Sequence, residues 1–154
     1  MFLLMTRTRQ VLAACIFALA FQSPALAEQF ERFGPYVAHY NTFNTTLLTA
    51  DVARAYGITR SGNLALINIA LLKVQDGGMD EPMHAEVSVG ASNLAGQRKN
   101  IDIVEIEDRG AIYYIATFRI RDEERINFNI SIQPSDDPRR VHRFSFDQMF
   151  YVDD

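Results

Sequence analysis

Hydrophobic and polar residues alternate along most of the chain from Tyr36 onward, and clusters of turn-forming residues interrupt them every eight to fourteen residues. Alternation with a period of two is typical of β-strands, and frequent turns are typical of a sandwich or barrel. The pattern predicts seven strands, over residues 36–43, 63–74, 83–91, 101–107, 112–120, 125–133 and 141–151. This favours an all-β fold, a single immunoglobulin-like antiparallel β-sandwich, with a closed barrel as the alternative.

The clearest strand is Arg125–Gln133, in which isoleucines and a phenylalanine alternate with polar residues. One face of this strand should lie in the core and the other in water. Ile112–Ile120 alternates in the same way, and the polar Arg121–Glu124 between the two predicts that they form a β-hairpin. Residues 83–91 are predicted to pair with residues 63–74.

One segment breaks the period of two and predicts a short helix after the first strand. It starts at Thr49, a residue type common at helix N-caps, and stops at Gly57. Residues 63–74 differ again, because both faces of this strand are apolar around a single Asn68. Both faces must therefore be covered. We expect the helix to cover the outer face, and a homodimer interface is the alternative.

The first residues have the three parts of an export signal. Two arginines precede the apolar run Val11–Phe21, and Ala25-Leu26-Ala27 is a small-x-small cleavage motif. Eleven apolar residues are far fewer than the ~20 that span a bilayer. The sequence predicts a cleavable signal over residues 1–27, a single domain over residues 28–154, a periplasmic location and no membrane span in the mature chain.

Cys15 is the only cysteine of the chain and lies within the predicted signal. It follows Leu12-Ala13-Ala14, as in a lipoprotein signal, but the apolar run continues beyond it to Phe21. In a lipoprotein signal the apolar segment precedes the cysteine. The mature domain should therefore contain no disulfide and no thiolate nucleophile or metal ligand.

The domain is acidic, which argues against nucleic acid as a partner. The formal net charge is −4, and removal of the two signal arginines makes it −6. Binding to phosphates requires clustered lysines and arginines. The densest basic cluster, Arg139, Arg140 and Arg143, follows Asp136-Asp137 and is interpreted as a solvated turn.

Several short blocks of the chain resemble a known family. Tyr36–Thr45, followed by Val52-Ala53, Tyr56-Gly57-Ile58 and Arg60-Ser61, resembles the start of a family of Gram-negative bacteria, domain of unknown function 4426. Ala111–Ile115 resembles a later block of that family. The resemblance covers nearly all of the mature chain. It implies an exported single domain and supplies no activity, substrate or site residue.

The first predicted strand is unusually rich in aromatic and amide side chains. It provides a candidate ligand site together with the loop after the helix, consisting of His39, Tyr40, Asn41, Asn44, Arg60 and Ser61. In the alternative interpretation, His39 bonds to backbone while Asn44 and the threonines after it cap turns.

Copper is the alternative ligand. Met79 and His84 offer the thioether and imidazole groups that copper binds, and His39 or His142 could complete the set. However, alternation sends Met83 inward and His84 outward, which argues against convergence of these groups.

Signals for catalysis are weak. The chain has no Gly-x-Ser-x-Gly motif and no phosphate-binding glycine loop, and Ser61 and Ser131 have no local base. We therefore predict a non-enzymatic module that binds an unknown envelope protein or small ligand and needs no cofactor. Copper handling and a hydrolase with an unrecognised triad are the alternatives, so the question of enzymatic activity stays open.

Overall fold

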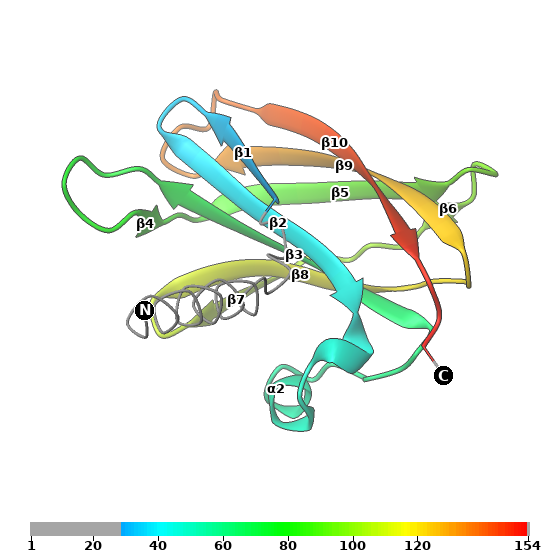
Figure 1. Ribbon diagram of the computed structural model, residues 1–154. Coiled ribbons are helices and arrows are strands. Elements are labelled where there is room, and N and C mark those ends of the chain that lie inside the picture. The colour runs from blue at the N-terminus through cyan, green and yellow to red at the C-terminus, as the bar shows by residue number, and fades with distance from the viewer. Residues whose placement is uncertain (1–28, 154) are drawn as a thin grey trace, which may run out of the picture.

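The structure, a computed structural model, describes residues 29–153, so the predicted export signal and its cleavage site lie outside the described residues. Two antiparallel sheets form a sandwich (Figure 1). The strands are β1 (Gln29–Phe33), β2 (Tyr36–Asn44), β3 (Leu64–Lys73), β4 (Glu81–Pro82), β5 (Ala85–Asn93), β6 (Arg98–Lys99), β7 (Val104–Asp108), β8 (Ala111–Arg119), β9 (Glu124–Pro134) and β10 (His142–Phe150), and the helices are the 3-10 helix η1 (Thr45–Leu47) and α2 (Ala50–Ala55).

Seven of these strands are the seven that alternation predicted, and their order is that of an immunoglobulin domain. In the larger sheet, the consecutive neighbours β2, β3, β8 and β7 take the positions A, B, E and D. In the smaller sheet, β10, β9 and β5 take the positions G, F and C. The predicted β-sandwich is thus confirmed. The remaining strands are β1 and β4 in the larger sheet and β6 in the smaller one.

Two predicted pairings are wrong. β8 and β9 form no hairpin, because β8 pairs with β3 and β7 while β9 pairs with β10 and β5 in the other sheet. For the same reason β5 is not the partner of β3. Among the seven predicted strands, the hairpins with short loops are β9–β10 and β7–β8. The latter turns through Arg109 and Gly110 at φ of 50° and 83°, the left-handed backbone that a two-residue hairpin turn requires.

Aromatic rings fill the space between the two sheets. Phe128 on β9 is fully buried and stacks on Phe146 of β10, with ring centroids 4.9 Å apart and an interplanar angle of 17°. Phe118 of β8, in the opposite sheet, meets Phe128 edge-on at 5.5 Å. The two sheets therefore share one continuous core, and the predicted core face of Arg125–Gln133 is confirmed.

The helix α2 follows β2, as predicted, and lies on the outside of the larger sheet (Figure 1). Thr49 caps it by accepting a hydrogen bond from Val52 N, and Gly57 ends it at φ +65°. Tyr56 donates a hydrogen bond of 2.8 Å to Asp108 at the end of β7, which ties the helix to the sheet and raises the pKa of Tyr56. Within residues 29–153, no helix is both long and apolar enough to cross a membrane.

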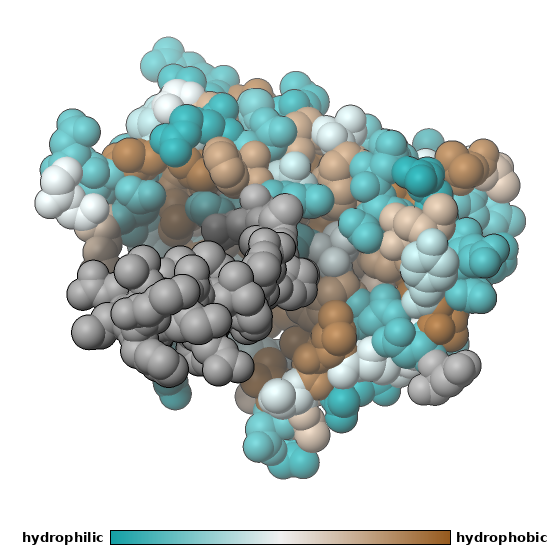
Figure 2. Space-filling view, in the orientation of Figure 1, coloured by the Kyte–Doolittle hydropathy of each residue, from teal (hydrophilic) through white to brown (hydrophobic). Residues whose placement is uncertain are grey.

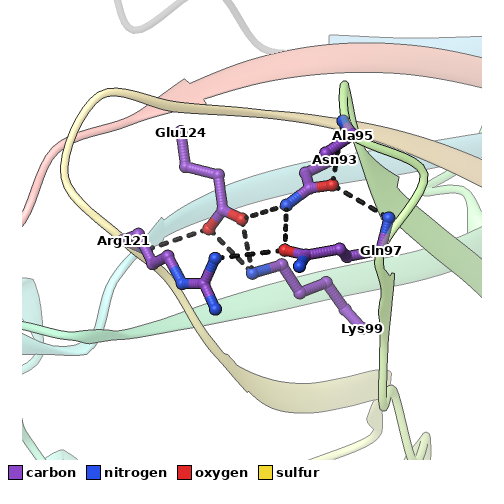
Figure 3. A network of polar contacts seen from close by, with 6 residues as sticks. All are labelled: Asn93, Ala95, Gln97, Lys99, Arg121 and Glu124. Carbon is purple, nitrogen blue, oxygen red and sulfur yellow. Dashed lines mark hydrogen bonds and ion pairs between the residues drawn. The ribbon is translucent and has the colours of Figure 1, made fainter.

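A network of polar contacts holds the connection between β8 and β9, where the chain passes from the larger sheet to the smaller one (Figure 3). The carboxylate of Glu124, the first residue of β9, is 7% exposed and lies 2.7 Å from Nζ of Lys99. Asn93 Nδ2 and the Arg121 amide also donate to it, each at 2.9 Å. Burial alone would raise the pKa of Glu124, but the hydrogen bonds from Lys99, Asn93 and Arg121 hold it below its ordinary value.

Candidate functional site

A hollow lies on the outer face of the larger sheet, over β2, β3 and β8 and beside α2. It comprises two neighbouring depressions of about 220 and 930 Å³, which share several lining residues. The lining includes His39, Asn41 and Phe43 from β2, Leu66, Asn68, Ala70 and Leu72 from β3, and Tyr113 and Ile115 from β8. In Figure 2, hydrophobic surface gathers on this face next to the helix. The helix therefore covers only part of the apolar outer face of β3.

Asn68 is the polar residue at the centre of this hollow. Its neighbours across the strands are Asn41 on β2 and Ile115 on β8. The side-chain oxygen of Asn68 is buried and receives no hydrogen bond from any described residue. A buried acceptor without a donor costs roughly 1–3 kcal/mol, so native proteins seldom keep one without a reason. The hollow thus combines apolar walls with one acceptor that a bound donor could satisfy.

Two of the six predicted site residues point into the hollow. His39 and Asn41 lie on the outer face of β2, where the ring of His39 approaches that of Phe30 with centroids 6.2 Å apart. Tyr40 borders the hollow, but its ring packs in the core against Phe144 at 4.9 Å. Successive residues of a strand point to opposite faces, so three consecutive residues cannot all serve one site.

The other three predicted residues hold the loops at the end of β2. Asn44 donates to the carbonyl oxygen of Tyr151 at 2.7 Å, and Arg60 donates to a carbonyl oxygen of η1 at 3.0 Å. The hydroxyl of Ser61 lies 2.8 Å from Oδ1 of Asn63 and donates to it. These contacts stabilise the segment between β2 and β3, and the structure does not bring them together with His39 and Asn41.

The predicted copper ligands belong to different surroundings. Met79 is 93% exposed in the loop between β3 and β4. The ring of His84 instead contacts two carboxylates of β7, with Nδ1 3.0 Å from Glu105 Oε1 and Nε2 3.5 Å from Glu107 Oε1. Met83 packs against the core, as alternation predicted.

The other two histidines do not face each other. His142 stacks on Phe33 with centroids 4.3 Å apart and an interplanar angle of 5°, and its Nε2 lies 3.7 Å from Glu31. That distance is too long for a hydrogen bond. His39 lies on the outer face of the larger sheet, whereas Phe33 and His142 lie against the inner side. One ion could not bind both rings.

Sequence reasoning missed Glu105 and Glu107 as candidate ligands. Their spacing of two residues was a usable signal, because it puts both carboxylates on the same face of a strand. Their approach to His84 could not be foreseen, since it depends on how the two sheets meet. Asn68 was noticed only as an interruption of an apolar strand.

A family model and solved structures match most of the chain. The family model described as Domain of unknown function (DUF4426) matches residues 30–153. The chain belongs to the DUF4426 family. A crystal structure of a DUF4426 family protein from Pseudomonas aeruginosa PAO1 is 31% identical, with a TM-score of 0.70, and the match covers 82% of this chain and 97% of that chain. No curated protein matches the chain.

The fold of this DUF4426 chain also occurs in FetP of uropathogenic Escherichia coli strain F11. The as-isolated protein, expressed in the periplasm, is 9% identical with a TM-score of 0.58, covering 83% of this chain and 96% of that chain. A copper-bound variant of FetP is 10% identical with a TM-score of 0.56, covering 82% and 96%. At these identities the similarity shows a common fold and no common function.

Proposed function

We propose that this chain is an exported, non-enzymatic binding module of the bacterial envelope, and that its ligand or partner occupies the hollow on the larger sheet. The observation that carries this proposal is the buried oxygen of Asn68, which receives no hydrogen bond from residues 29–153, at the centre of an apolar surface. The proposed ligand has an apolar body and an N–H or O–H group that donates to this oxygen. Two packed sheets hold the surface rigid, which reduces the entropic cost of binding.

Replacing Asn68 by leucine should separate binding from stability. We expect Asn68→Leu to leave the free energy of unfolding unchanged or to raise it by about 1 kcal/mol, because it removes a buried acceptor that no described residue pairs and keeps the side-chain volume. Urea denaturation measures this change. Asn129→Leu, on the exposed face of β9, is the matched control.

Binding is tested with the same three proteins. Immobilised wild type, Asn68→Leu and Asn129→Leu are exposed to envelope extract, and the retained small molecules and proteins are identified by mass spectrometry. A component retained by wild type and Asn129→Leu but lost from Asn68→Leu supports the proposal. Equal retention by all three, or a marked loss of stability in Asn68→Leu, contradicts it.

Export is the second part of the proposal and predicts the mature N-terminus. Because Ala25-Leu26-Ala27 fits the signal peptidase, the mature protein should begin at Glu28 and be recovered from the periplasmic fraction. Intact-mass measurement of the purified protein checks this. A mass that still includes Cys15 with attached acyl chains would show a lipoprotein instead.

Copper handling is the second candidate function, since a variant of FetP with the same fold binds copper. The residues of this chain give it less support than the hollow gives to a binding module. Met79 is almost fully exposed, and the neighbours of His84 are carboxylates, which are harder ligands than the thioethers that suit Cu(I).

A further inference from the structure

A histidine and two glutamates meet where an edge of the larger sheet approaches the smaller one. His84 directly precedes β5 of the smaller sheet, and Glu105 and Glu107 lie on β7, at the edge of the larger sheet. One ligand atom from each of the three side chains lies within 4.8 Å of the other two. This group is separate from the hollow, because alternation turns Glu105 and Glu107 to the inner side of the sheet and Ile106 to the outer side.

A buried tyrosine holds Glu105 in place. The hydroxyl of Tyr114 donates a hydrogen bond of 2.7 Å to Glu105 Oε2 and accepts one of 2.6 Å from the amide of Ala85. Tyr114 is only 2% exposed, so its hydroxyl is held rigidly in the core. Its hydrogen bond to one oxygen of Glu105 keeps the other oxygen of Glu105 beside His84. Such outer hydrogen bonds commonly orient the carboxylates that bind metals.

The charge of this group is not balanced. Glu105 and Glu107 share one face of β7, and His84 is the only described residue that forms an ion pair with either of them. A single imidazole can balance at most one of the two carboxylates. A divalent cation would balance both, in a domain whose net charge is already negative.

We propose that His84, Glu105 and Glu107 bind a divalent first-row transition ion, for which Zn²⁺ serves as the probe. Imidazole and carboxylate together suit Zn²⁺ or Cu²⁺, whereas Ca²⁺ prefers oxygen ligands alone. Two ligands at ~2.1 Å from a tetrahedral ion lie about 3.4 Å apart. The observed separations of 3.0 and 3.5 Å run from different ring nitrogens, Nδ1 to Glu105 and Nε2 to Glu107. Since one ligand atom from each residue lies within 4.8 Å of the other two, the exposed carboxylate of Glu107 must turn towards an ion held by Nδ1 and Glu105. One ring nitrogen binds the ion, and water completes the coordination.

Zinc titration by calorimetry tests this site on the mature wild-type protein and on single-residue variants. We expect one Zn²⁺ per chain, with the dissociation constant at least ten-fold weaker in His84→Ala and in Glu107→Gln. Glu107 is 64% exposed, so Glu107→Gln should remain folded, which its melting curve verifies. Glu86→Gln, an exposed carboxylate outside the group, and Met79→Leu are the matched controls and should bind Zn²⁺ as the wild type does.

The outcomes distinguish this site from the hollow and from a thioether site. Absence of saturable Zn²⁺ binding, or equal affinity in wild type, His84→Ala and Glu107→Gln, overturns the proposal. So does loss of zinc affinity in Met79→Leu, which would assign the metal to a sulfur ligand. Asn68→Leu should retain full zinc affinity, so failure of the hollow as a binding site and failure of the metal site are independent results.

Discussion

Replacing Phe128 by alanine is expected to lower the free energy of unfolding by roughly 3–5 kcal/mol. The ring is fully buried and contacts aromatic rings from both sheets, so its removal leaves a cavity that neither sheet can fill alone. This loss is a large part of the ~5–15 kcal/mol that stabilises a typical domain. Urea denaturation of the mature protein measures it.

Asn129→Ala is the matched control, because Asn129 is the next residue on the same strand and faces water. Its effect should stay within about 0.5 kcal/mol, as for most exposed positions. If Asn129→Ala proved the more damaging change, the two faces of β9 would be exchanged. The stacking of Phe128 on Phe146 would then be wrong as well.

Replacing Glu124 by alanine is expected to be nearly as damaging, at roughly 3–5 kcal/mol. The substitution leaves the ammonium group of Lys99, only 13% exposed, without its counter-charge, and it removes the acceptor of Asn93 and the Arg121 amide. Asp51→Ala breaks an ion pair with Arg54 that is largely exposed, and should cost about 0.5 kcal/mol at most. Thermal or urea denaturation at neutral pH compares the two variants.

The contribution of Glu124 to the free energy of unfolding should also depend on pH. Its folded-state pKa lies below the ordinary value of 4.5, so its contribution to stability is complete above that value and is lost as the pH falls through the folded-state pKa. The difference in unfolding free energy between wild type and Glu124→Gln should therefore shrink in acid. A constant difference from pH 7 to pH 3 would show that the carboxylate gains nothing from its ionised partners.

The sequence predicted where the strands lie better than how they pair. Alternation identified the buried face of β9, because a strand with one face in the core carries apolar residues on that face and polar residues on the other. It did not identify the partner of β8. Arg121–Glu124 has the composition of a hairpin turn, but Glu124 is buried against Lys99, which lies on another strand of the smaller sheet. β1 was missed because it is short and is followed at once by Gly34-Pro35.

The candidate site was predicted only in part for a related reason. His39 and Asn41 share the outer face of β2, and that much follows from their spacing. Their convergence with Asn68 depends on the register between β2 and β3, which pairs Asn41 with Asn68. The meeting of His84 with Glu105 depends on the approach of two sheets. Contacts that arise from pairing and packing leave no local signal in the chain.

The crossing of the chain between sheets after β8 has a consequence for how the domain folds. Most paired strands follow one another along the chain, and the short hairpins β1–β2, β7–β8 and β9–β10 can form early. The pairs β3–β8 and β5–β9 join residues from 33 positions apart (Asn93 and Ile126) to 55 positions apart (Leu64 and Arg119). The entropic cost of closing these loops must be met before core contacts between the strands can form. Domains dominated by such distant pairings fold in about milliseconds to seconds. Until β3 and β8 pair, their apolar edges are exposed, and the acidic surface is then the main protection against association with other unfolded chains.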